Sequence, residues 1–323
     1  MIKLVHAPSK SSYSRFIQDL EAVCPDIEDW VLSGIHHLYS LLPNFGANLA
    51  LDGKFIDSYA TPYGKYKKRK DKRADLEADI AIKQRHHKTG LVTKEKHYGF
   101  RCHLIVDTTY ELPVAWKVTS ASRGEPTIAK QLIGDLGETV LKGAKYLMAD
   151  RGYSGNPLQN LLKEADITPI IDNPHKWQGE ETRQYLDTDL IYKESGEVFW
   201  VSDRGQAIPL SYKGYDSSCD SLRYGFHPKY QDKRIFRLKR SVEPIIFNRV
   251  ARDSQMFKRL YKKRAAVEGV NGRLDRDFRF ERHTIRGLKK MSSAVAMSFL
   301  VMIGFALGKA KLGQRSHLAS WVV

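Results

Sequence analysis

The chain has 323 residues, enough for one large core or two modest ones, so length alone leaves the number of domains open. Hydrophobic residues make up 42% of it, and no segment has the composition of a disordered region, so we expect a folded globular protein. A formal net charge of +16 favours a polyanionic partner, above all nucleic acid. A merely soluble basic protein and a binder of anionic membranes are the alternatives that this charge leaves open.

Cysteines and apolar segments bear on the compartment. Cys24, Cys102 and Cys219 are far apart and odd in number, which argues against a disulfide framework or a C-x-x-C zinc site and is typical of the reducing cytoplasm. The N-terminus lacks the apolar core of a signal peptide. The apolar stretch 294–307 is shorter than the roughly 20 residues that a bilayer requires, so we interpret it as a buried core helix and expect no membrane contact.

A short helical segment, residues 1–46, precedes the first chemically distinctive region. Residues 48–59 then have the pattern of a strand that carries Asp52 and Asp57. Because successive side chains of a strand alternate between faces, we expect Asp57 to point away from Asp52.

A basic run, residues 65–73, follows this strand closely. Such runs are usually solvated loops, but its position beside an acidic strand leads us to predict contact with DNA phosphates. Within the neighbouring polar stretch, His86 and His87 are interpreted as solvated rather than metal-binding. The basic residues for which we predict DNA contact are Lys65, Lys67, Lys68 and Arg69.

Residues 97–173 predict the body of a sheet. Two adjacent strands, 97–107 and 112–119, form a hairpin with Asp107 at its turn, where aspartate is favoured for its local hydrogen bonds. After a helix near 127–136, an apolar run ends in Asp150 and predicts a strand buried on both faces. A helix beginning near Asn156 and a short strand at 168–172 follow.

The C-terminal half predicts an insertion and then helices. Residues 174–255 contain short strands with turn signals between them, including one at 198–201 that holds Trp200. A helix over 256–277 would place Tyr261, Arg264 and Glu268 on one face. A further helix fills 288–312, and residues 313–323 form a tail.

This order predicts an α/β fold, an RNase H-like mixed sheet flanked by helices, with a β-rich insertion before the last catalytic helix. The core would comprise residues 47–173 and 256–312. Asp52 and Asp150 would lie at strand ends and Glu268 on a helix packed across the sheet. Three converging carboxylates of this kind can bind two hard cations that promote phosphodiester chemistry.

The sequence resembles a known family, the DDE transposases of bacterial insertion sequences, in the subgroup with a Tyr-x2-Arg-x3-Glu-x6-Lys signature. The resemblance spans about residues 47–310 and departs from the signature at Asp275, where the family has lysine. A His or Asn usual in the family is likewise replaced by Arg123-Gly-Glu125. The motifs that carry the resemblance are Leu51-Asp-Gly-Lys54, His103-Leu-Ile-Val-Asp107 with Leu112-Pro113, Met148-Ala-Asp-Arg-Gly-Tyr153, Arg264-Ala-Ala-Val-Glu268 and Phe280 to Lys289.

The resemblance implies roles for individual residues. Asp52, Asp150 and Glu268 would bind two Mg²⁺ or Mn²⁺ ions, and Tyr261 and Arg264 would contact phosphates near the cut. The contact of the missing signature lysine is either lost or taken by Arg273 or Arg276. Some family members stack a flipped base on a tryptophan of the insertion. Trp200 is the candidate by position, although a core role is the more ordinary one for it and for Trp177.

The function that follows is cut-and-paste transposition, in which strands are cleaved at element ends and joined to target DNA. The resemblance further implies terminal inverted repeats as the DNA partner, a homodimer on paired ends, and a place in the cytoplasm at the nucleoid. A truncated or domesticated DNA binder without catalysis and an RNase H-like nuclease without strand transfer are the alternatives.

Overall fold

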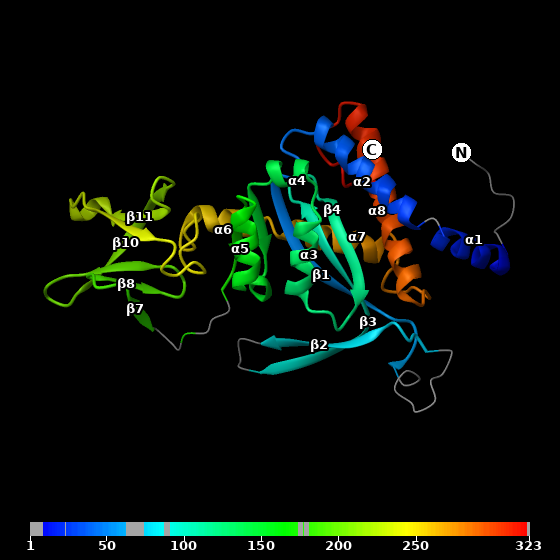
Figure 1. Cartoon of the computed structure of the whole chain (residues 1–323), viewed down its shortest axis with the longest axis horizontal. Coiled ribbons are helices and arrows are strands. Elements are labelled where there is room, and N and C mark those ends of the chain that lie inside the picture. The colour runs from blue at the N-terminus through cyan, green and yellow to red at the C-terminus, as the bar shows by residue number, and fades with distance from the viewer. Residues whose placement is uncertain are drawn as a thin grey trace. The chain divides into compact units, whose positions relative to one another are not determined.

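The computed structural model describes residues 9–22, 24–62, 74–86, 91–173, 177 and 181–321 (Figure 1). The chain forms two compact units. The first comprises residues 1–46, 52–128 and 266–323, and the second comprises 47–51 and 129–265. These units cut across the five predicted segments, because the strand over residues 48–57 belongs to both. The segment boundaries therefore stay a prediction.

The helical side of the first unit consists of α1 (Lys10–Ala22), α2 (Cys24–Leu41) and α8 (Leu288–Lys311). In α2, the apolar residues Ile27, Val31, Ile35 and Leu38 recur at helical spacing and are buried. Helices α2 and α8 lie side by side (Figure 1). Their close approach depends on Gly34, where a Cβ atom would lie 2.5 Å from Ile303 Cγ2.

Helix α8 is long and apolar enough, by length and composition alone, to cross a membrane. Half of its most apolar window is buried within the protein. Its inner face packs on α2 and on strand β4, where Phe299 meets Trp116 edge to face at 5.1 Å. These contacts are those of a core helix in a folded unit, as the sequence predicts.

The sheet of the first unit is antiparallel and contains β2 (Asp79–His86), β3 (Val92–Asp107) and β4 (Leu112–Ser120). Strand β3 is long enough to pair with β2 along its first half and with β4 along its second half. The second half of β1 (Asn48–Asp57) joins β3, and Ser58 N donates to Tyr98 O at 2.7 Å. At this junction Gly99 is required, because a Cβ there would lie 2.2 Å from Ile56 O.

The sheet of the second unit is parallel: the first half of β1 pairs with β5 (Tyr146–Ala149), and β5 pairs with β6 (Thr168–Ile171). All four residues of β6 are buried, as are Leu147, Met148 and Ala149 of β5, which explains why these strands lack alternation. The helices between these strands are α3 (Glu125–Gly134), which spans the boundary of the units, α4 (Glu138–Gly143), a 3-10 turn at Arg151–Tyr153, and α5 (Asn156–Glu164).

The insertion forms a separate antiparallel sheet in the order β12-β11-β10-β9-β8-β7. It has its own hydrophobic core, in which Leu222, Tyr224, Leu238 and Phe247 are almost fully buried. Its strands are β7 (Thr182–Gln184), β8 (Leu190–Lys193), β9 (Val198–Val201), β10 (Ala207–Asp216), β11 (Ser221–Phe226) and β12 (Ile235–Lys239). A 3-10 turn at Pro228–Tyr230 precedes β12.

Mixed strand directions, flanking helices and the β-rich insertion confirm the predicted α/β, RNase H-like fold. One prediction was wrong in detail. The expected single helix over 256–277 is two helices, α6 (Gln255–Lys262) and α7 (Ala265–Arg276). They are separated by a tight turn in which Lys263 N and Arg264 N donate to carbonyls three residues earlier, at 2.9 and 3.0 Å.

Candidate functional site

The parallel strands of the second unit place aspartates at equivalent positions. The last paired residues are Leu51 with Ala149 and Ala149 with Ile171. The next residue on each strand is an aspartate, namely Asp52, Asp150 and Asp172. Asp52 and Asp150 were expected at strand ends. Asp150 does follow the last residue of β5, whereas Asp52 lies within β1, one residue beyond the part of β1 that pairs with β5. Asp172 was not predicted to have a role, although it too follows an apolar strand, as Asp150 does.

Asp150 is held by its own backbone. It is half-buried and caps the 3-10 turn that follows, since its Oδ1 accepts a hydrogen bond from Gly152 N at 2.8 Å. No residue that the structure describes hydrogen-bonds its other carboxylate oxygen. The motif Asp150-Arg-Gly therefore fixes the carboxylate in orientation and leaves one oxygen for a further contact.

Within the first unit, an ion pair joins β1 to α7. Lys54 Nζ lies 2.6 Å from Asp275 Oδ2. Asp52 precedes Lys54 by two residues and so lies on the same face of β1, whereas Glu268 precedes Asp275 by two helical turns and so lies on the same side of α7. Asp52 therefore lies on the face of β1 that carries Lys54, and Glu268 lies on the side of α7 that carries Asp275.

The acidic side chains of Asp52 and Glu268 differ in their exposure to solvent. Asp52 is half-buried and Glu268 is exposed in the first turn of α7. In the described part of the chain, no three Asp, Glu, His or Cys side chains are grouped so that they could hold a metal ion. Convergence of the three predicted carboxylates thus stays a prediction.

Asp57 and Asp107 lie as their sequence positions suggest. Asp57 contacts His97 Nδ1 at 3.0 Å, on the pleat of β1 opposite to Asp52. The fully buried Asp107 accepts hydrogen bonds from Tyr110 N at 2.7 Å and Gly46 N at 2.9 Å. Both carboxylates are thus occupied by contacts within the fold.

Tyr261 and Arg264 belong to a charged cluster of the second unit. Burial raises the pKa of the Tyr261 phenol, the charges of Asp172 and Asp150 raise it further, and Arg264 opposes them. The break between α6 and α7 lies between these two residues and Glu268, so the three residues are not on one continuous helix as predicted. Since the charge of Asp150 acts on Tyr261, Tyr261 lies within electrostatic range of one of the predicted catalytic carboxylates.

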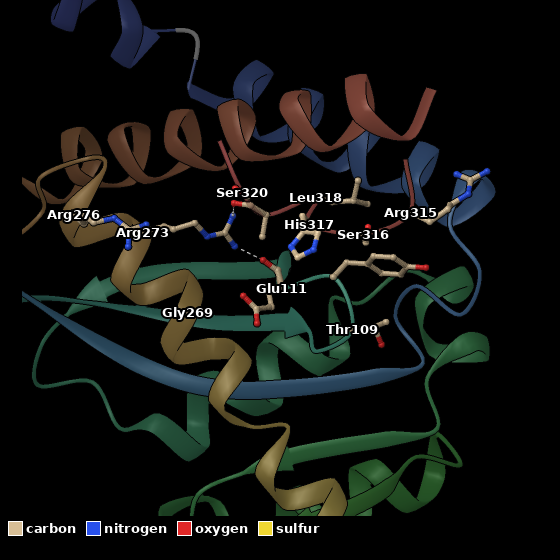
Figure 2. A pocket seen from close by; sticks show the side chains of 12 residues that line it. Thr109, Glu111, Gly269, Arg273, Arg276, Arg315, Ser316, His317, Leu318 and Ser320 are labelled. Atoms are coloured by element: carbon tan, nitrogen blue, oxygen red, sulfur yellow. Dashed lines mark hydrogen bonds between the residues drawn. The ribbon is translucent and has the colours of Figure 1, made fainter. Parts of the chain in front are cut away.

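Arg273 has a different position from the one expected. Its side chain is buried, and its guanidinium donates to Glu111 O and, at 3.2 Å, to Ala319 O. Figure 2 shows it at the wall of a cavity of about 670 Å³ between α7, the β3–β4 turn and residues 315–320. In this arrangement Arg273 does not face solvent, whereas the exposed Arg276 pairs with Asp277 at 2.7 Å.

The two tryptophans of the insertion are only partly buried. Trp200 packs edge-on against Phe226 at 5.5 Å, and the Arg234 guanidinium lies 4.7 Å from its ring centroid. Trp177 is covered in the same way by Arg183 at 4.0 Å. A base could stack on the covered face of Trp200 only if Arg234 moved aside.

Part of the predicted site lies outside the described residues. This applies to the basic run, with Lys65, Lys67, Lys68 and Arg69, and to the His86 side chain and His87.

Beyond Asp172, two ion pairs at β1 were missed. One is Lys54 with Asp275, and the other is Arg101 with Glu125 at 2.9 Å, close to where a Cβ of Gly53 would lie. Glu125 belongs to the segment Arg123-Gly-Glu125, which stands where the resemblance implies a His or Asn. Its pairing depends on the packing of α3, which no local pattern encodes.

The family model described as transposase DDE domain matches residues 48–303. A search of curated proteins finds no match. Among solved structures, the chain is similar to the piggyBac transposase in a synaptic complex with hairpin DNA, at 10% identity and a TM-score of 0.27. That alignment covers 86% of this chain but 59% of the piggyBac chain, less than two thirds of its length.

Proposed function

Because this chain belongs to the transposase DDE domain family, we propose that it cleaves DNA strands at the ends of a mobile element and joins them to target DNA. We assign catalysis to Asp52, Asp150 and Glu268. The observation that best supports the assignment is the register of β1 and β5, whose paired residues Leu51 and Ala149 are each followed by one of the two aspartates.

The donor chemistry of these residues fits divalent metal ions. The three carboxylates offer only oxygen ligands, which Mg²⁺ and Mn²⁺ prefer, and Asp150 has a carboxylate oxygen without a protein partner in the described structure. Two such ions, when bound, would supply an activated water or 3'-hydroxyl and would stabilise the leaving oxygen. Gly152 N fixes the orientation of Asp150, so the protein contributes a preset ligand.

The proposed DNA contacts follow from charge and position. Tyr261 lies within electrostatic range of both Asp150 and Arg264, and we propose that a phosphate bound beside Asp150 also meets the Arg264 cation. The basic run from Lys65 onward would add backbone contacts at the inverted repeats. We further propose that two copies act on paired ends, in the cytoplasm where the DNA is.

The test is nicking and strand transfer on DNA that carries the flanking inverted repeats, with Mg²⁺ and without it. Asp150→Asn is the informative variant, because its amide oxygen can still accept from Gly152 N while the charge is lost. We expect a loss of cleavage of at least about 10- to 100-fold, with end binding retained, because a neutral amide is a weaker ligand for a hard divalent cation than a carboxylate and even the loss of a group that only supports metal ligands costs this much. Asp135→Asn, an exposed aspartate on the same unit, is the matched control and should cleave normally.

Each of the other outcomes would indicate a different function or a different catalytic set. Binding without cleavage by the wild type would indicate a non-catalytic DNA binder. Cleavage without joining would indicate a nuclease. Full activity of Asp150→Asn would remove Asp150 from the proposed catalytic set.

A further inference from the structure

The ion pair between Lys54 and Asp275 is short and largely shielded from solvent, unlike an ordinary surface pair. Its atoms are 2.6 Å apart, and only 13% of the Lys54 side chain and 22% of the Asp275 side chain are exposed. The second oxygen of Asp275, Oδ1, is buried and has no hydrogen-bond partner among the described residues. Lys54 is therefore the main counter-charge for a carboxylate that would otherwise be costly to bury.

The pair joins the two elements that carry Asp52 and Glu268. Asp52 lies two residues before Lys54, about 7 Å along the same face of β1. Glu268 lies seven residues before Asp275, about 10 Å along the same side of α7. A contact at Lys54 and Asp275 thus limits how far α7 can slide along β1 and how far it can rotate, and so constrains the separation of Asp52 and Glu268.

The position of Asp275 in the sequence makes the pair unexpected. The signature that the sequence resembles has lysine at this place on the helix. In this chain the helix carries the acid, and the lysine comes from β1 instead. The amine of Lys54 is directed at Asp275 and is mostly shielded from solvent, so it is poorly placed to meet a DNA phosphate directly.

We propose that Lys54 and Asp275 are a positioning pair that holds β1 and α7 in the register at which Asp52 and Glu268 can serve one catalytic centre. The proposal rests on the proposed function, because it assumes that these two carboxylates act together. It assigns Lys54 no contact with the reacting atoms. Its effect passes through the geometry of the carboxylates.

The experiment compares three variants with the wild type. Lys54→Met removes the charge at similar length, Asp275→Lys gives the helix the signature lysine opposite Lys54, and the double variant Lys54→Asp/Asp275→Lys restores the pair in reverse. Lys142→Met is the matched control, because Lys142 forms an equally short but exposed pair with Glu138, at 2.7 Å. The measurements are Mn²⁺ binding by calorimetry, end binding without divalent ions, strand cleavage, and thermal unfolding.

We expect each single variant to lose about 10- to 100-fold in Mn²⁺ affinity and in cleavage, the range seen when a residue that orients metal ligands is removed. End binding without metal should stay within twofold, and the double variant should recover most of both losses. Lys142→Met should behave as the wild type.

Two results would overturn the proposal, and a third would bear on the proposed function instead. Weaker end binding by Lys54→Met, with no rescue in the double variant, would make Lys54 a direct DNA contact. Lower melting temperatures with unchanged Mn²⁺ affinity and unchanged cleavage by the folded fraction would make the pair purely structural. Failure of the wild type to cleave DNA would contradict the proposed function, whereas rescue of Mn²⁺ affinity by the double variant would still support the positioning pair.

Discussion

Asp253 is a carboxyl group that the fold makes difficult to ionise. Burial raises its pKa to about 6, and the nearby Glu197 adds to this, while Lys258 and a hydrogen bond involving Tyr224 oppose it. Its Oδ1 is buried without a partner among the described residues. An unfolded chain would give this group a pKa near 3.8, so the folded and unfolded states bind its proton differently between these two values.

The folded state takes up the proton first as the pH falls, so Asp253 makes the fold more stable below about pH 4 than above pH 6. Asp253→Asn should therefore be more stable than the wild type at pH 8, by about 1–3 kcal/mol, and this difference should vanish toward pH 4. Urea unfolding of both proteins from pH 4 to pH 8 measures it. Parallel stability profiles over that range would contradict the assignment.

Single residues were predictable where a local motif defines them. Asp150 at the end of an apolar strand and Asp107 at a hairpin turn needed no knowledge of the rest of the chain. The partners of Lys54 and Arg273 were not predictable, because Asp275 and Ala319 lie far from them in the sequence and only packing brings them together.

At the scale of elements, helices and strands could be predicted where burial imposes a recognisable pattern of apolar residues. The buried strands β5 and β6 and the core helix α8 were identified from their apolar patterns. Strand β2 was missed because it is stabilised by pairing with β3 while Ile80 and Ile82 remain exposed, so its alternation does not mark a buried face. The break after α6 was missed because the residues there include neither Gly nor Pro, and helical spacing continues through it.

Residues 313–321, which follow α8, contact both C-terminal helices of the first unit, α7 and α8. Lys309 Nζ donates to Ser320 O at 2.7 Å, and Arg273 of α7 donates to Ala319 O. Trp321 donates from Nε1 to Asp277 Oδ2 at 2.5 Å and packs edge-on against Phe305 at 5.1 Å. This segment therefore helps to hold α7, the helix that carries Glu268.

Trp321→Ala removes both the ring packing and the hydrogen bond, and we expect it to lower the free energy of unfolding by about 2–4 kcal/mol. Trp321→Phe retains an aromatic ring and loses only the hydrogen bond, so it should cost about 1 kcal/mol. Denaturant unfolding of the three proteins separates the two contributions. Equal stability of Trp321→Ala and the wild type would mean that the segment does not pack on α7 and α8.

For the whole molecule, the dominant property is the positive charge. A net charge of +16 attracts DNA over distances longer than any single contact, and it does so without regard to sequence. The charge itself could be read from composition. Which cations touch phosphate could not, since many of them are neutralised within the fold, as Lys54, Arg101 and Arg240 are by carboxylates 2.6–2.9 Å away.

The basic run offers the clearest test of where that charge acts. Each phosphate contact that is lost should reduce the slope of log affinity against log salt by about 0.9. Replacing Lys65, Lys67, Lys68 and Arg69 together with alanine should therefore flatten the slope by up to about 3.6 if all four follow the DNA backbone. The measurement is a titration of inverted-repeat DNA at several salt concentrations. The matched control replaces four exposed cations of the insertion, Arg183, Arg204, Lys229 and Lys233. An unchanged slope for the basic-run variant would mean that these residues are solvated, whereas equal flattening by the control would mean that the affinity reflects net charge alone.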